Sequence, residues 1–262
     1  MLDQRTGNPE DHYTRGFMEF LKVMALALLP AIGNFGGGLL AEYLRTTRQT
    51  LSLALHAAAG IVIAVVAIEL MPEALGGAPP WTVVLAFLLG GAFSIVLERG
   101  VDALKDRLGG GETGTGAWMI YAAVSVDLFS DGLMIGVGSV VSFSLALILA
   151  IGQVTADIPE GFATIANFKD KGVPRARRIL LSASFILPAL LGAALGYWLL
   201  RGASEIWQLS ALAFVAGLLL VAAIEDMITE AHEAAADSRW SAMSLVGGFA
   251  LFTLIASYFE TG

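Results

Sequence analysis

The segment VDLFSDG, residues 126–132, places two aspartates inside an apolar run that extends from Ala117 to Ser139. Asp127 and Asp131 are four residues apart, so a helix stacks their side chains on one face. On insertion scales, an isolated charge at the centre of a bilayer costs about 2.5–3.5 kcal/mol. Two acids kept at that cost indicate a functional site rather than a lipid-facing surface.

A second polar segment follows in IGQVTADIPEG, residues 151–161. Gln153, Asp157 and Glu160 stand at positions i, i+4 and i+7, which again form one helical face. Pro159 removes one backbone donor from this helix, and the glycine after Glu160 permits close approach of another helix. Both features are expected where a helix lines a cavity.

The two acidic faces can meet and bind a divalent cation. The connection between the two segments is short, so their helices are expected to be antiparallel neighbours with the acids at similar depth. Neither segment offers Lys or Arg at that depth, whereas a bound cation would neutralise the acids. We therefore predict a metal site formed by Asp127, Asp131, Asp157, Glu160 and Gln153. Oxygen ligands suit Mn²⁺, Mg²⁺ or Ca²⁺, and Fe²⁺ and Zn²⁺ remain open.

The composition identifies the environment of these acids. Of the 262 residues, 56% are hydrophobic and only 15% are charged, and the apolar residues come in blocks long enough to cross a bilayer. The chain has no cysteine, which excludes disulfides and thiolate metal sites and leaves carboxylates, histidines and backbone as ligands. The formal net charge of −8 identifies no partner by itself.

Eight apolar segments are each near or above the ~20 residues that a transmembrane helix needs. They cover residues 17–44, 51–75, 80–104, 117–139, 141–168, 176–200, 206–231 and 240–259. We expect an all-α membrane protein in which residues 17–262 form an eight-span transmembrane domain. The polar residues 1–16 are expected to form a short soluble tail.

Basic residues collect on one side of this topology, and cytoplasmic loops are the loops that collect them. The connections after spans 1, 3, 5 and 7 hold Arg45, Arg48, Arg99, Lys105, Arg107, Lys169, Lys171, Arg175, Arg177, Arg178 and Arg239. The other side holds only Arg5, Arg15 and Arg201, and Lys22 lies within span 1. Both termini are therefore expected outside the cytoplasm, in an integral protein of a bacterial cytoplasmic membrane.

An internal repeat relates the two ends of the chain. AGIVIAVVAIELMPEA at residues 59–74 matches AGLLLVAAIEDMITEA at residues 216–231 at an offset of 157 without gaps, which pairs Gly60 with Gly217. Five spans separate the two copies, so the second copy enters the membrane from the opposite face. Inverted repeats are typical of transporters, with the substrate bound near the midplane.

Two further matches extend the repeat to spans 1–3 and 6–8, around the central spans 4 and 5. The offset of 157 takes Gly90 onto Gly247, each followed by a second glycine. LPA at residues 29–31 recurs at residues 187–189 with an offset of 158.

Further acids lie near the ends of the two best-matched spans. Span 2 carries Glu69 and Glu73 near its outer end, and span 7 carries Glu225, Asp226 and Glu230, followed by His232, near its inner end. The repeat makes these clusters equivalent at opposite mouths, so we expect them to feed and drain the central site. Asn34, in GNFGGG of span 1, is interpreted as a polar residue that packs helices.

The PEG of ADIPEG in span 5, the acidic pair in span 4, ELMPEA in span 2 and the eight spans resemble the ZIP (Zrt- and Irt-like) family of divalent-metal transporters. The resemblance covers nearly the whole chain. It implies one or two metal ions bound midway across the membrane by HNxPEG-type motifs in both central spans.

The motif positions read here Asp127, Leu128 and Asp131 in span 4, Ala156, Asp157 and Glu160 in span 5, and Leu187 in span 6. Family members have His, Asn and Glu in the central spans and often a carboxylate before the proline of span 6. This chain therefore lacks both imidazoles and two ligands of a second metal. What remains after these departures from the family pattern is a single oxygen-only cluster.

The predicted function is alternating-access transport of a divalent ion toward the cytoplasm, with Zn, Mn, Fe or Mg as substrate, and not enzymatic catalysis. Two alternatives remain open. DLFSD is similar to the spaced aspartates of Mg-dependent prenyl or phosphatidyl transferases, although spans 4 and 5 lack a base for the phosphates short of Lys169. The other alternative is a membrane scaffold that transports nothing.

The expected partners are divalent metal ions and the lipid bilayer, not nucleic acid, and a homodimer is left open.

Overall fold

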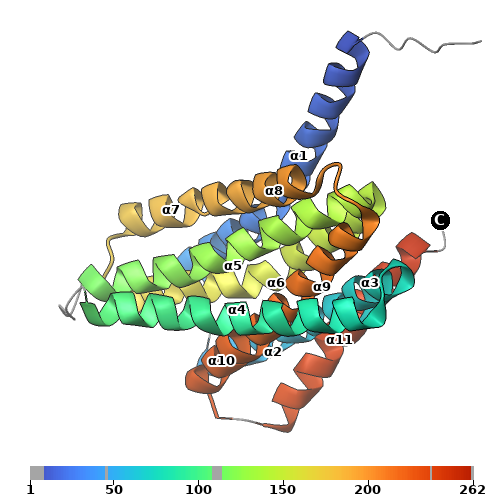
Figure 1. The fold of residues 1–262 in the computed structure, drawn as a ribbon. Helices are drawn as coiled ribbons and strands as arrows, with labels where there is room; N and C mark the ends of the chain where they lie inside the picture. Colours follow the sequence, from blue (N-terminus) through green and yellow to red (C-terminus); the bar gives the residue numbers. More distant parts are fainter. Residues whose placement is uncertain (1–8, 45–46, 108–113, 237, 261–262) are drawn as a thin grey trace, which may run out of the picture.

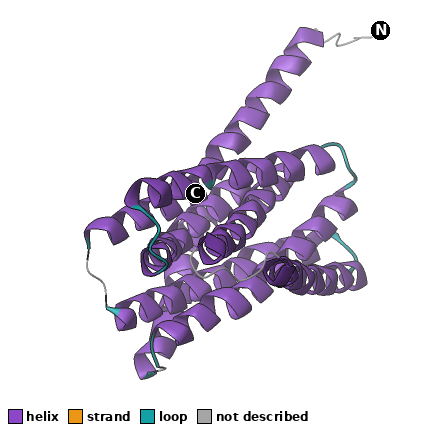
Figure 2. Cartoon of the chain, turned by 90° about the vertical axis from the view of Figure 1, so that its left-hand side faces the viewer, coloured by secondary structure: helices purple, strands orange, loops and turns teal. Residues whose placement is uncertain are grey.

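The computed structural model describes residues 9–44, 47–107, 114–236 and 238–260, and these form helices joined by short loops (Figures 1 and 2). The helices are α1 Pro9–Tyr43, α2 Arg48–Ala64, η1 Val65–Leu70, α3 Met71–Gly77, α4 Pro80–Arg107, α5 Gly114–Val141, α6 Phe143–Asp170, α7 Arg175–Ser184, α8 Ile186–Leu200, α9 Glu205–Ala222, η2 Ala223–Ile228, α10 Thr229–Ala234 and α11 Arg239–Glu260. The described part of the chain contains no strand.

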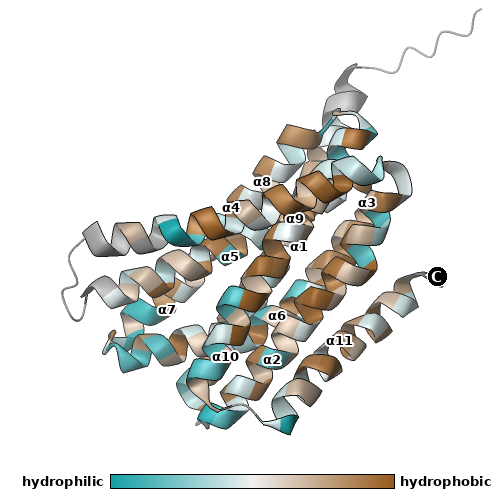
Figure 3. Cartoon of the chain, turned by 60° about the horizontal axis from the view of Figure 1, so that its bottom comes forward, coloured by the Kyte–Doolittle hydropathy of each residue, from teal (hydrophilic) through white to brown (hydrophobic). Residues whose placement is uncertain are grey.

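Within the described ranges, eight helical segments are long and apolar enough to cross a membrane, which confirms the all-α, eight-span prediction. They run Gly16–Tyr43, Arg48–Gly77, Pro80–Gly100, Gly116–Val141, Phe143–Asp170, Arg175–Leu200, Glu205–Ala234 and Arg239–Phe259. Hydrophilic residues gather near α7 and α10, at the ends of the spans (Figure 3). Of the predicted polar tail, residues 1–8 lie outside the described residues, and the helix α1 already begins at Pro9 and projects from the bundle (Figure 1).

The helices pack as two bundles. The carboxylate bundle consists of α1, α5, α6 and α8, and the flanking bundle consists of α2, α4, α9 and α11. The main contacts within each bundle are α1 with α6 and α5 with α8, and α4 with α9 and α2 with α11. The bundles meet mainly where α2 packs on α6 and α5 packs on α9. These pairings exchange under the inverted repeat, in which α1 corresponds to α8, α2 to α9, α4 to α11 and α5 to α6.

Close helix contacts in the flanking bundle fix the register of the repeat. A Cβ on Gly60 would lie 2.0 Å from the Leu245 carbonyl oxygen, and one on Gly217 would lie 2.0 Å from that of Phe87. Since backbone packs against backbone here, no side chain fits. The offset of 157 between Gly60 and Gly217 is therefore reproduced in space.

The helices that pack on α9 and α2 are α4 and α11. They correspond to each other with an offset one residue larger than the 157 that sequence matching predicts. A Cβ on Gly90 would lie 1.8 Å from the Phe214 oxygen, and one on Gly248 would lie 1.9 Å from that of Ala57. Gly247, the predicted partner of Gly90, has nothing within 4 Å of its Cβ position. Gly90 thus pairs with Gly248. Adjacent glycines make the two alignments indistinguishable in sequence, but only one of them faces the neighbouring helix.

The carboxylate bundle has the same kind of symmetry with another offset. A Cβ on Gly37 would lie 1.8 Å from the Ile158 oxygen, and one on Gly192 would lie 2.0 Å from that of Phe129. Gly37 and Gly192 are 155 residues apart, whereas the two LPA segments are 158 apart. The LPA match is therefore not the spatial equivalence, because backbone contact rather than proline position sets the helix register.

Prolines and π-helical turns interrupt the spans. α7 ends at Ser184 and α8 begins at Ile186 because Pro188, four residues after Ser184, cannot donate to the Ser184 carbonyl group and its ring crowds that group. The π-helical turns η1 and η2 lie at equivalent places in the two repeats. Such turns are frequent at functional sites, and these two contain the equivalent acids Glu69 and Asp226.

We expect Gly90→Ala and Gly248→Ala each to destabilise the protein by about 1–3 kcal/mol, because the added methyl group must push two helix backbones apart. Gly247→Ala is the matched control, since its Cβ position is open. The measurement is the fraction of folded protein that remains after heating in detergent. Equal losses for Gly247→Ala and Gly248→Ala would show that the one-residue shift is wrong.

Candidate metal centre

The central acids converge because α5 and α6 are antiparallel neighbours. A single residue, Ser142, separates the two helices, and its hydroxyl group caps α6 by accepting a hydrogen bond from the Leu145 amide at 3.0 Å. One carboxylate oxygen from each of Asp127, Asp131 and Asp157 lies within 4.8 Å of the other two. The structure thus brings together acids that are 30 residues apart in the sequence.

The centre is deeply buried. Asp131 and Asp157 are 0% exposed, Gln153 is 1% exposed and Glu160 is 8% exposed. The Gln153 amide group donates a hydrogen bond to Asp131 Oδ1. Glu160 Oε2 accepts a bond of 3.5 Å from Asn34 Nδ2 on α1. Two neutral amides are therefore the hydrogen-bonding neighbours of this group of four acids.

Several oxygens of the centre have no hydrogen-bond donor among the described residues. They are Asn34 Oδ1, Asp127 Oδ2, Asp131 Oδ2, Gln153 Oε1 and both carboxylate oxygens of Asp157. Buried polar atoms in proteins are normally satisfied, so a set of converging oxygens without donors is suited to accept a cation. Carboxylate and amide oxygens are the ligands of hard divalent ions, so the donor set fits such a substrate.

Glu42 shows how the same fold neutralises another buried carboxylate. Its side chain is 3% exposed at the end of α1. Arg178 binds both carboxylate oxygens, with 2.8 Å from Nη2 to Oε2, and Arg175 and Lys169 approach at 3.6 and 4.0 Å. No basic residue of the described chain forms such an ion pair with the central acids. Among the described residues, no base is thus placed to compensate a negative charge on the central cluster.

The motif positions of α5 and α6 are spatially equivalent. A Cβ on Gly132 would lie 1.9 Å from the Ala189 oxygen of α8, and one on Gly161 would lie 1.8 Å from the Asn34 oxygen of α1. Each glycine directly follows an acid of the centre, Asp131 or Glu160. The two acids therefore occupy matching places next to the closest helix contacts of the bundle.

Two of the residues that replace family ligands lie away from the centre. Leu128 is fully buried in an apolar cluster with Val124, Phe185 and Ala189. Leu187 is 59% exposed on α8. Neither side chain offers an oxygen, so the described structure supports one carboxylate centre rather than a pair.

A cavity of about 420 Å³ connects the centre with one end of the bundle. Asp127 and Glu160 line it, whereas the fully buried Asp131 and Asp157 lie behind them. The predicted mouth acids of the second repeat, Glu225, Asp226 and Glu230, line the same cavity. Besides parts of α4, α9, η2 and α10, it is lined by the first half of α5 and the last part of α6, which is the end that the charge pattern predicts to be cytoplasmic.

The other predicted mouth residues lie outside this cavity. Glu69 is half-buried on η1, and Glu73 is exposed on α3. His232 is exposed, and its ring centroid lies 5.3 Å from that of His56 on α2. The structure therefore brings one of the two acidic mouths into contact with the cavity and leaves the other apart.

Sequence reasoning missed several residues of the cavity. Glu98 of α4 and Glu233 of α10 line it, as does Asn167, whose amide group donates a 2.7 Å hydrogen bond to Glu230 Oε1. Asn34 was interpreted as a packing residue, but it also contacts Glu160. Its position among glycines in an apolar span was the available signal, whereas Glu98 stands near a helix end where acids are common.

The fold and the site define an eight-span membrane protein with a buried carboxylate centre. No known protein-family profile matches the chain. It is similar to the zinc transporter ZIP6 of Homo sapiens, with 27% identity over 163 residues, which are 59% of this chain and 22% of that protein. It is also similar to ZIP6 of Pongo abelii, with 28% identity over 151 residues, 54% of this chain and 20% of that protein. The chain thus spans about a fifth of the length of the curated relatives that it matches.

Neutralising the central acids is expected to weaken metal binding at least tenfold while the fold persists, because Asp131→Asn and Asp157→Asn keep side-chain shape but remove charge. Asp170→Asn, at the exposed end of α6, is the matched control. Isothermal titration of the purified protein with Mn²⁺ and Zn²⁺ measures the effect. Parent-like affinity in both buried variants would mean that these aspartates only join helices by hydrogen bonds.

Proposed function

We propose that this chain is a ZIP-like transporter that carries a divalent metal ion across the membrane through the carboxylate centre. The observation that carries the proposal is the cluster of Asp127, Asp131 and Asp157, whose oxygens converge within 4.8 Å without a basic partner among the described residues. The similarity to the zinc transporter ZIP6 over more than half of the chain supports the same class.

Alternating access follows from the repeat and its broken symmetry. Glu225, Asp226 and Glu230 line a cavity that reaches Asp127 and Glu160, while the equivalent acids of the first repeat do not line it. A carrier that is open on one side has this asymmetry, because the two repeats exchange roles when it opens on the other side. With the orientation that the basic residues indicate, this cavity is the exit toward the cytoplasm.

The donor set favours hard ions. Asp127 and Ala156 stand at the positions of the family imidazoles, so carboxylate and amide oxygens are the side-chain ligands. Such ligands suit Mn²⁺ and Mg²⁺, whereas imidazole nitrogen favours Zn²⁺. We infer that Mn²⁺ is carried in preference to Zn²⁺.

Proteoliposomes containing the parent chain are expected to take up Mn²⁺ several-fold faster than Zn²⁺. Asp127→His should reverse the order toward Zn²⁺, because it restores an imidazole at the centre. Uptake of each ion is measured by metal analysis of washed vesicles, with Asp131→Asn as the inactive control. If the parent and Asp131→Asn vesicles take up every ion equally, the chain is not a carrier.

The two mouths should affect opposite half-reactions. With metal presented outside, Glu73→Gln is expected to slow loading, because it removes an exposed carboxylate from the outer mouth. Glu230→Gln should slow release several-fold, because this acid lines the exit cavity. Stopped-flow uptake and efflux from preloaded vesicles separate the two steps, with Glu205→Gln as the exposed control. An equal loss of equilibrium metal binding in both variants would contradict separate roles.

A further inference from the structure

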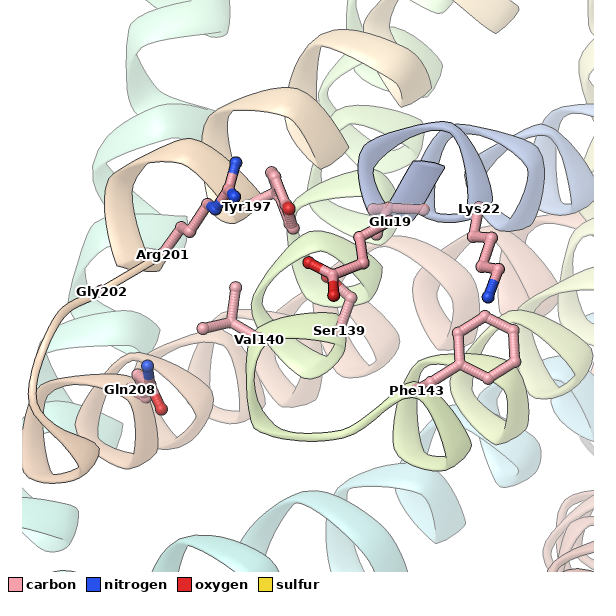
Figure 4. Close-up of a pocket in the computed structure, with 10 residues that line it drawn as sticks. Glu19, Lys22, Ser139, Val140, Phe143, Tyr197, Arg201, Gly202 and Gln208 are labelled. Atoms are coloured by element: carbon pink, nitrogen blue, oxygen red, sulfur yellow. The ribbon is translucent and has the colours of Figure 1, made fainter. Parts of the chain in front are cut away.

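A second cavity, of about 470 Å³, lies at the other end of the bundle (Figure 4). Its walls come from the first part of α1, from the α5–α6 connection and from the turn between α8 and α9. Pockets of this volume are large enough for a small-molecule group. None of the residues of the carboxylate centre lines it.

Three charged side chains surround this space. In Figure 4 the Glu19 carboxylate points into the region between Lys22 and Arg201. Lys22 Nζ lies 5.7 Å from the centre of the Phe143 ring, and the Arg201 guanidinium lies 5.4 Å from that of Trp198. No ion pair joins the three charges in the part of the chain that the structure describes. The cavity thus presents a carboxylate flanked by two cations.

The polar groups around the charges are held in place. Gln208 Nε2 donates to the carbonyl oxygens of Leu200 and Ala203, at 3.3 and 3.1 Å, which fixes the turn that carries Arg201. Gly202 supports this turn with a φ of 80°, a conformation that other residues rarely adopt. The backbone that carries Arg201 is therefore fixed at the edge of the cavity.

The two helices at the rim expose apolar side chains beside the charged groups. On α1 these are Phe17 and Leu21, and on α8 they are Leu195, Trp198 and Leu199, each at least 44% exposed. Both helices belong to membrane spans, so these side chains face acyl chains. A ligand with a charged head and apolar tails would match both parts of this surface.

We propose that this cavity binds the headgroup of an aminophospholipid. Arg201 and Lys22 supply the positive charge for the phosphate, and Glu19 accepts hydrogen bonds from the primary ammonium group. A purely anionic headgroup would meet the Glu19 carboxylate, and a trimethylated ammonium has no N–H to donate to it. Because Gln208 lies on α9 and the other polar groups lie on or beside the carboxylate bundle, the headgroup contacts both bundles.

Native mass spectrometry of the purified full chain tests this assignment with phosphatidylethanolamine, phosphatidylcholine and phosphatidylglycerol added in turn. The parent should retain phosphatidylethanolamine at least several-fold more than the other two lipids. Glu19→Gln should reduce that preference to about equal retention of ethanolamine and choline lipids. The double variant Lys22→Gln/Arg201→Gln should lose retention of all three.

Two controls keep the interpretation specific. Glu205→Gln removes an exposed carboxylate outside the cavity, and Arg48→Gln/Arg239→Gln removes two exposed bases from the opposite end, so both should behave like the parent. Equal retention of the three lipids by the parent, or an unchanged preference in Glu19→Gln, would overturn the proposal. Competition by soluble glycerophosphoethanolamine at concentrations equal to those of the lipid would do the same, because the site would then take a free zwitterion.

Discussion

The free energy of burying uncompensated carboxylates constrains this structure more than any other interaction. An isolated charge at the bilayer centre costs about 2.5–3.5 kcal/mol, whereas an interhelical hydrogen bond in a membrane contributes about 0.6 kcal/mol on average. The hydrogen bonds from Gln153 and Asn34 are therefore too weak to balance three buried acids and the half-buried Asp127. A divalent cation bound here would interact with all of the acids at once, so the centre would be stabilised by the same ion that the chain is proposed to carry.

Close backbone packing seals these acids from lipid. Gly132 and Gly161 allow α8 and α1 to approach α5 and α6 directly beside Asp131 and Glu160. A larger residue at either place would separate the helices and admit lipid or water to the carboxylates. The contacts that make the bundle compact are thus the contacts that preserve a low-dielectric environment around the centre, where electrostatic attraction to a cation is strongest.

The two copies of the inverted repeat have similar helix packing but differ in whether their acids line the cavity. Their helix pairings and glycine contacts correspond closely, as Gly60 and Gly217 demonstrate. The surroundings of their acids differ, because Asp226 lines the cavity and the equivalent Glu69 does not. Equivalent packing with unequal access is the arrangement in which small shifts between packed helices can exchange an open end for a closed one.

The sequence by itself determined the eight spans and the acidic faces, because hydropathy, span length and helical periodicity are local properties. It also indicated that Asp127, Asp131, Asp157 and Glu160 could meet, since one short connection forces their helices together. Only the tertiary structure decided that Asn34 contacts Glu160, that Gly90 pairs with Gly248, and that Glu98 lines the cavity beside Asp127. Each of these depends on the rotation and sliding of one helix against another. Those movements are set by side-chain and backbone contacts between distant segments, so no pattern along a single segment encodes them.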